Sequence, residues 1–212
     1  MKRYFHNELS DIRTKLILIG EKSIEAGQLA VKGFLENDLD IIELALSLDD
    51  QIDDLEVEID RAAVRYTTLR SPMSADVRLI FVAIKASHDL ERAGDEAHSI
   101  AKKTRNILNR YGNIENPVHI EKMALLAFDM MRDAITCFVE EDIELAQSIP
   151  PRDKEVDNLN KENFKTLSDR ATTDLIDTPT AIETILISKS IERIADHSKN
   201  LAQEVVYLLT GK

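Results

Sequence analysis

The chain of 212 residues contains the same pattern of residues twice, and this duplication limits the folds that it can adopt. The stretch ERAGD begins at Glu91, and the related stretch ERIAD begins 101 residues later at Glu192. A second pair of stretches, 34–55 and 138–159, aligns without a gap at an offset of 104 residues. Because a unit of roughly 100 residues is long enough for a small domain, the sequence predicts two similar halves.

Both halves carry the apolar spacing of long α-helices. Near the N-terminus the steps alternate between four and three, which is typical of helices that pack as in coiled coils, at Phe5, Leu9, Ile12, Leu16 and Ile19. The chain has only 6 Gly and 5 Pro, no Trp, and 31% charged residues. This composition favours an all-α protein over a β-sheet protein.

Turn and capping signals divide the chain into six long helices. The expected helices begin near Phe5 and then cover about 38–69, 74–109, 118–139, 142–170 and 180–209. Pro150 and Pro151 predict a kink or short break in the fifth, because proline removes a backbone donor. The stretch YGNIENP is the clearest linker signal. We therefore expect two tandem, internally repeated antiparallel three-helix bundles, residues 1–110 and 118–212, joined by the linker 111–117.

The overall charge and the lack of targeting signals narrow the class of protein. The net charge of −12 argues against a nucleic-acid partner and against an anionic membrane surface, and it suits cations or basic protein patches. The single cysteine, Cys137, lies in an apolar helical stretch and is interpreted as a core residue. No signal-peptide pattern or membrane-length apolar run is present, so we expect a soluble cytoplasmic protein without direct membrane insertion.

Four pairs of carboxylates occupy matching positions in the two halves. Side chains four residues apart lie on the same face of a helix. One such pair means little, because 39 acidic residues in a chain of 212 give about seven pairs by chance. The duplication is the stronger signal. The pairs are Asp49–Asp53 and Glu91–Asp95 in the first half, and Asp153–Asp157 and Glu192–Asp196 in the second.

These carboxylates continue the apolar stripes that should face neighbouring helices. Glu91 lies seven residues after Ile84, and the same spacing separates Glu192 from Ile185. Carboxylates buried there need compensating charge, since burying an unpaired charge is strongly unfavourable. Carboxylates of two antiparallel helices can converge on shared metal ions. Oxygen ligands favour Mg²⁺, Ca²⁺ or Mn²⁺, and iron is also compatible.

Nearby basic residues offer a second source of compensation. Arg92 and Arg193 are interpreted as partners in structural ion pairs. His98 and His197 follow the acidic pairs closely, and each is either a peripheral ligand or an ordinary surface histidine. His88 lies three residues before the first glutamate, on a similar face.

The duplicated pattern resembles the E/D-x-x-x-D helix motif of the PhoU family, the phosphate-signalling proteins of bacteria. The matching stretches are ERAGD at Glu91–Asp95 and ERIADH at Glu192–His197. The stretch FHNELSDIRTKLILIGEKSIEAGQLAV is similar to the first helix of the family, and so is the LRSP break before ADVRLIFVAIKASHDLERAGD. The resemblance covers essentially the whole chain, and one departure is Ala195, where the family often has glycine.

The resemblance implies a regulatory adaptor without catalytic residues, often a homodimer. It implies that the adaptor connects the phosphate ABC transporter, through a PstB-like ATPase, with a PhoR-like sensor histidine kinase. Such an adaptor acts as a negative regulator of the phosphate-starvation response, in phosphate homeostasis and signal transduction.

The resemblance also implies metal ions at the acidic motifs. Iron is the expected metal, with Mg, Mn, Ca or Zn as alternatives. Asp50 and Asp54 form a neighbouring acidic pair, but Asn158 stands opposite Asp54 in the repeat, which favours the register of Asp49 and Asp53. The implied ligands are Asp49, Asp53, Glu91, Asp95, Asp153, Asp157, Glu192 and Asp196.

Two other interpretations remain open. A ferritin-like carboxylate-bridged di-metal oxidase usually needs two Glu-x-x-His motifs, and the nearest approach here is a single Asp95-x-x-His98. A metal-free helical scaffold, serving another phosphate carrier, would leave the acidic pairs solvated or paired with Arg and Lys. The sequence shows no glycine-rich anion cradle that would predict direct phosphate binding.

Overall fold

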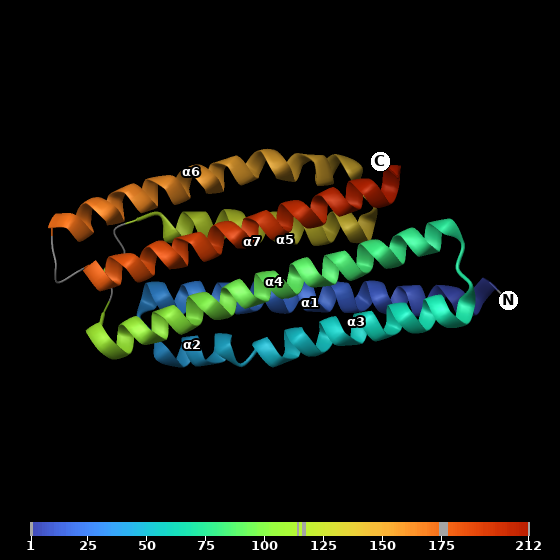
Figure 1. The fold of residues 1–212 in the computed structure, drawn as a ribbon, viewed down its shortest axis with the longest axis horizontal. Helices are drawn as coiled ribbons and strands as arrows, with labels where there is room; N and C mark the ends of the chain where they lie inside the picture. The colour runs from blue at the N-terminus through green and yellow to red at the C-terminus, as the bar shows by residue number, and fades with distance from the viewer. Residues whose placement is uncertain (1, 114, 116–117, 174–177, 212) are drawn as a thin grey trace.

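The computed structural model describes residues 2–113, 115, 118–173 and 178–211, with the side chains of residues 2–7 and 173 excepted. Within these ranges the chain forms helices and no strand (Figure 1). The prediction of an all-α fold is confirmed. The helices are α1 (Lys2–Glu36), α2 (Leu39–Leu46), α3 (Asp49–Arg70), α4 (Ser74–Tyr111), α5 (Ile120–Glu140), α6 (Ile143–Thr173) and α7 (Thr178–Thr210).

The helices pack as two antiparallel bundles that lie side by side. In the first, α1 packs along α2, α3 and α4, and in the second, α7 packs along α5 and α6. Helix α4 also lies against α7, and α1 against α5, so the two bundles share a long interface (Figure 1). The predicted pair of three-helix bundles is present. Residues 114, 116 and 117 of the predicted linker lie outside the described part of the chain.

One continuous apolar core runs through both bundles. The predicted stripe residues Ile12, Leu16 and Ile19 of α1 are buried in it, together with Ile191 of α7. Cys137 is also buried there, as predicted, and burial raises the pKa of its thiol to about 12. The side chain of Phe5 is outside the described set. Among the described residues, no helix combines the length and the apolar composition needed to cross a membrane.

The helix predicted over 38–69 is divided into α2 and α3, so this part of the prediction was wrong. The hydroxyl of Ser47 donates to the carbonyl oxygen of Leu44 at 2.7 Å, and α3 begins two residues later. The apolar spacing continues across the break, which is why periodicity did not reveal it. The division places Asp49 and Asp50 in the first turn of α3, where the helix dipole stabilises negative side chains.

Of the kink or short break expected at Pro150 and Pro151, the break is absent from the backbone. Helix α6 passes through both prolines and is bowed rather than interrupted (Figure 1). Ala146 and Ile149, which precede the prolines, are buried in the shared core. Packing of this turn offsets the backbone hydrogen bonds that two prolines remove.

The backbone repeats with the offset seen in the sequence. Asn37 and Glu141 are 104 residues apart, and both adopt left-handed backbone angles, with φ of 56° and 57°. The next residue in each half is an aspartate, Asp38 or Asp142. Its carboxylate accepts hydrogen bonds from two backbone N–H groups of the following turn. This capping starts α2 and α6 in the same way.

Candidate functional site

Helices α3 and α4 bring the two acidic pairs of the first half together. Desolvation raises the pKa of Asp53, and repulsion from Asp49 and Asp95 raises it further. Desolvation also raises the pKa of Glu91, and Asp95 adds repulsion there. Asp53 therefore lies within electrostatic reach of Asp49 and Asp95, and Glu91 within reach of Asp95. Asp53 and Asp95 are nevertheless exposed, so the expectation of buried carboxylates on these stripes was wrong for these two residues.

Two histidines of α4 border these carboxylates. The Nδ1 atom of His98 lies 2.9 Å from an oxygen of Asp49. The Nδ1 atom of His88 lies 3.2 Å from Glu56 Oε1 and 3.8 Å from Glu91 Oε2. Ligand atoms of Glu56, His88 and Glu91 all lie within 4.8 Å of one another, which is compact enough for one ion. We call the carboxylates and histidines of α3 and α4 the α3–α4 cluster: Asp49, Asp53, Glu56, His88, Glu91, Asp95 and His98.

Sequence reasoning missed Glu56 as a member of this cluster. Its signal was present, because Asp49, Asp53 and Glu56 follow one another at steps of four and three on α3. The predicted motif contains only acidic residues spaced four apart, so it does not include Glu56, which follows Asp53 by three residues.

Several atoms of the α3–α4 cluster are buried without a hydrogen-bond partner. They are Glu91 Oε2 and both ring nitrogens of His98. The close contact between His98 and Asp49 does not have hydrogen-bond geometry. Since buried polar atoms nearly always have hydrogen-bond partners, the Glu91 oxygen and one ring nitrogen of His98 are candidate ligand atoms for a cation. A mixture of imidazole and carboxylate ligands suits iron, manganese or zinc better than magnesium or calcium.

Arg92 supplies part of the compensating charge. Its Nη1 atom donates to Asp95 Oδ2 at 2.8 Å, and its Nε lies 3.4 Å from Glu91 Oε2. The predicted ion-pair role of Arg92 is thus present. Half of the Arg92 side chain is exposed, so solvent weakens the pair. One guanidinium leaves the five carboxylates of the cluster with an excess of negative charge.

The second half surrounds its carboxylates with lysines. Asp153 is buried, and the Nζ atom of Lys199 donates to it at 2.5 Å and to Asp196 at 2.7 Å. Glu192 is also buried and accepts a hydrogen bond from Lys189 at 2.5 Å. Desolvation lowers the pKa of Lys199, but its two carboxylate partners outweigh that effect and raise the pKa above its usual range. The ammonium groups therefore already bind these carboxylates.

The remaining sequence candidates of the second half lie around these pairs. Asp157 is half-buried on α6, one turn after Asp153. Arg193 donates to Glu96 of α4 at 2.9 Å, and His197 lies 2.9 Å from Asp89 of α4. Arg193 and His197 thus connect the two bundles, and His197 faces a carboxylate of the other half.

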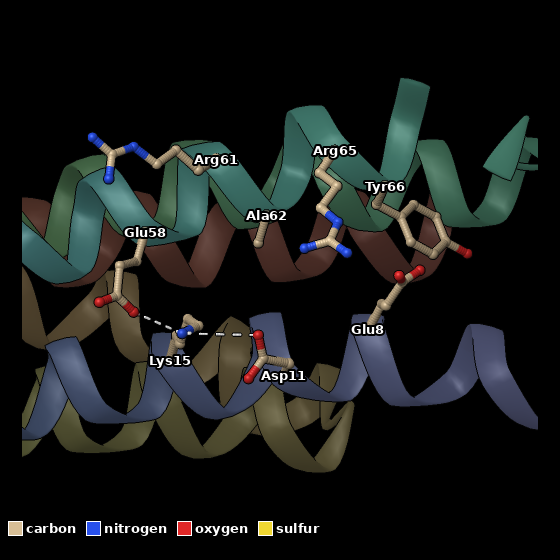
Figure 2. Close-up of a pocket in the computed structure, with 8 residues that line it drawn as sticks. All are labelled: Glu8, Asp11, Lys15, Glu58, Arg61, Ala62, Arg65 and Tyr66. Carbon is tan, nitrogen blue, oxygen red and sulfur yellow. Dashed lines mark hydrogen bonds and ion pairs between the residues drawn. The ribbon is translucent and has the colours of Figure 1, made fainter. Parts of the chain in front are cut away.

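A groove between α1 and α3 carries charged side chains of both signs. Its volume is about 440 Å³, and Figure 2 shows Lys15 between Glu58 and Asp11. The ammonium of Lys15 lies 2.7 Å from Glu58 and 3.8 Å from Asp11. Among the described residues, none of the buried atoms without a hydrogen-bond partner belongs to this groove. The groove therefore lacks the buried polar atoms without hydrogen-bond partners that make the α3–α4 cluster a candidate binding site.

Removal of one charge from the α3–α4 cluster is expected to stabilise the metal-free protein. Asp53→Asn should raise the free energy of unfolding by about 0.5 kcal/mol at pH 7, because it removes partly screened repulsion. The pKa of Asp53 is raised in the folded state, so the destabilising charge is absent at low pH and develops as the pH rises. The gain should therefore shrink as the pH is lowered toward about 4.

Urea unfolding of chelator-treated protein measures this effect. Asp54→Asn is the matched control, because Asp54 is adjacent and exposed but is not among the groups that raise the pKa of Asp53. Equal gains in the two variants would show that repulsion within the cluster is not the cause.

Gly94 permits the close approach of α3 and α4 at the cluster. A Cβ atom at Gly94 would lie 2.9 Å from Cδ1 and 3.0 Å from Cγ2 of Ile52. Overpacking costs about 1–3 kcal/mol, and the better helix propensity of alanine returns about 1. We therefore expect Gly94→Ala to lower the free energy of unfolding by about 1 kcal/mol.

The sequence of the second half indicates which substitution would relieve the overpacking caused by Gly94→Ala. Ala195 and Val156 occupy the positions that correspond to Gly94 and Ile52. Addition of Ile52→Val to Gly94→Ala should recover the lost stability in urea unfolding, because it removes the atom nearest the new methyl group. No recovery in the double variant would contradict this explanation of the glycine.

The chain matches a family model described as the PhoU domain over residues 16–104 and 120–205. It is 31% identical to the phosphate-specific transport system accessory protein PhoU homolog of Pseudomonas aeruginosa, with 100% of this chain and 87% of that protein covered. It is 29% identical to the PhoU protein of Escherichia coli, with 98% and 86% covered.

Solved structures agree with these matches. The crystal structure of PhoU from Pseudomonas aeruginosa superposes with a TM-score of 0.93 at 30% identity, covering 98% of this chain and 100% of that one. The phosphate transport system regulatory protein PhoU from Streptococcus pneumoniae shares the fold, with a TM-score of 0.89 at 24% identity and 98% of each chain covered. Because the family model matches two long segments, and because a relative and a solved structure match nearly the whole chain, the chain belongs to the PhoU family.

Proposed function

We propose that this protein is a cytoplasmic, metal-binding regulatory adaptor of phosphate homeostasis. The PhoU family consists of accessory and regulatory proteins rather than enzymes, and the relatives are named for the phosphate-specific transport system. The observation that supports a bound metal is the set of buried ligand atoms on Glu91 and His98 that have no hydrogen-bond partner. A regulatory adaptor needs surfaces that bind its partners and a signal that changes this binding. Metal binding between two helices would supply such a signal.

The metal would be held between α3 and α4. Asp49, Asp53 and Glu56 project from α3, and His88, Glu91, Asp95 and His98 project from α4. A bound cation would neutralise the excess negative charge and link the two helices, with iron as the proposed ion. Because the ion has ligands from two helices, metal binding would stabilise their packing against each other.

The proposed partners are a PstB-like transporter ATPase and a PhoR-like sensor histidine kinase. By contacting both, the adaptor would repress the phosphate-starvation response when phosphate is plentiful. The net charge of −12 favours basic surfaces on these partners. The proposed assembly is a homodimer of chains in which residues 1–110 and 118–212 are the two PhoU-like repeats, joined by residues 111–117.

Pull-down assays with the purified partners test the adaptor function. The metal-loaded protein should retain the ATPase or the kinase at low salt, and an unrelated ABC-transporter ATPase should not be retained. Light scattering coupled to gel filtration should give about twice the chain mass of 24.0 kDa. Failure to retain either partner, with metal present, would contradict the adaptor function.

A further inference from the structure

The two halves differ at the basic residues beside their matching carboxylates. Glu91 and Glu192 are 101 residues apart, and the same offset places Lys189 opposite His88 and Lys199 opposite His98. Imidazole has a nitrogen lone pair that binds metals, whereas an ammonium group has none. The second half therefore has cationic lysines at the two positions where the first half has histidines that could bind a metal.

A third position in the cluster also changes. The offset of 104 places Asn160 on α6 opposite Glu56 on α3. The side-chain oxygen of Asn160 accepts a hydrogen bond from Ser188 at 2.8 Å. Of the three residues whose ligand atoms gather in the first half, only the glutamate of the motif is retained in the second.

The lysines bind the carboxylates of the second half directly. Lys199 bridges Asp153 of α6 and Asp196 of α7, at 2.5 and 2.7 Å. Lys189 lies 2.5 Å from Glu192. Asp153 Oδ1 is buried without a hydrogen-bond partner, but the other oxygen of the same carboxylate already bonds to Lys199. The ammonium of Lys199 thus joins two helices as a bound cation would.

We propose that the carboxylates of the second half bind no divalent cation, because the ammonium of Lys199 occupies the position between Asp153 and Asp196. The family resemblance implies metal at both sets of motifs, and the residues of the second half do not fit it. This inference rests on the proposed function for the first half, which supplies the comparison site. The first half of the chain would then bind a divalent cation, whereas in the second half the lysine ammonium groups pair with the carboxylates in its place.

Manganese content per chain, measured by elemental analysis after equilibrium dialysis with Mn²⁺, tests this asymmetry. Asp153→Asn with Glu192→Gln should leave the manganese content of the protein unchanged. The matched variant of the first half, Asp49→Asn with Glu91→Gln, should lose it. A clear fall in manganese content for the second-half variant would overturn the inference. Wild-type protein without manganese would contradict the proposed function instead.

Exchange of the basic residues provides a reciprocal test. Lys189→His and Lys199→His, combined with Asn160→Glu, copy the first half at all three differing positions and should raise the manganese content to about twice that of the wild type, because imidazole and carboxylate replace ammonium and amide. His88→Lys with His98→Lys should abolish binding in the first half. Unchanged manganese content in the triple variant would overturn the role given to the lysines.

Thermal unfolding without metal tests the lysine bridge independently of any metal site. Lys199→Met should lower Tm by about 5 °C, because two carboxylates lose a partly buried partner. Lys199→Arg, which keeps the charge, should lose less. A Tm for Lys199→Met equal to that of the wild type would show that the ammonium does not compensate these carboxylates and would overturn the inference.

Discussion

Glu91→Gln is expected to abolish the stabilisation of the folded protein by Mn²⁺, whereas Glu192→Gln should leave it intact. Both glutamates occupy the same position of the repeated motif. A ligand at 100 times its dissociation constant stabilises a protein by about 2.7 kcal/mol, which corresponds to a rise in Tm of roughly 5–10 °C for this chain length. Glutamine has no negative charge and offers one weaker ligand oxygen in place of two carboxylate oxygens, so the rise in Tm should disappear only in the Glu91 variant.

The contrast between the variants follows from the surroundings of the two carboxylates. Glu91 Oε2 is buried without a hydrogen bond, although Arg92 Nε lies 3.4 Å and His88 Nδ1 3.8 Å away. Glu192 accepts a hydrogen bond from Lys189, which leaves its charge compensated. Tm measured with and without Mn²⁺, after removal of metal with a chelator, gives the result. A rise in Tm that survives Glu91→Gln and disappears with Glu192→Gln would reverse the assignment.

Phe34→Ala and Phe138→Ala should each lower the free energy of unfolding by about 3–5 kcal/mol. These residues are 104 positions apart in the repeat and are 1% and 2% exposed. Each belongs to the core cluster that runs through both bundles. Truncation leaves a cavity that close packing cannot fill. Arg13 lies over the ring of Phe138, 5.9 Å from its centroid, so Phe138→Ala also loses a cation–π contact.

Urea unfolding of these variants tests the shared core. Because the core is continuous, each variant should unfold in one transition at lower urea, rather than lose only its own bundle. Phe81→Ala and Phe164→Ala are the controls, since these rings are 62% and 57% exposed. Two separate transitions, or losses no larger than in the controls, would contradict a core common to both halves.

Periodicity and capping residues predict most of the helices, because both signals are local. The starts of α2 and α6 follow from Asp38 and Asp142, whose carboxylates bond to the next turn. The break before Asp49 and the continuity of α6 through its prolines could not be predicted in this way. The continuity of α6 depends on packing in the shared core, and the break before Asp49 leaves the apolar spacing unchanged.

The acidic members of the candidate site were predicted because their pattern occurs twice. Their partners were not, since the same carboxylate pattern accommodates either a metal or an ammonium group. The substitution of His98 by Lys199 in the repeat is visible in the sequence. That Lys199 reaches Asp153 on a different helix depends on the packing of α6 against α7.

The most direct measurement is a crystal structure of the protein grown with Mn²⁺, with anomalous diffraction recorded to locate the metal. We expect anomalous density between α3 and α4, beside Glu56, His88 and Glu91, and none beside Asp153. Anomalous density between α6 and α7 with none between α3 and α4, or no anomalous density in either half, would contradict it.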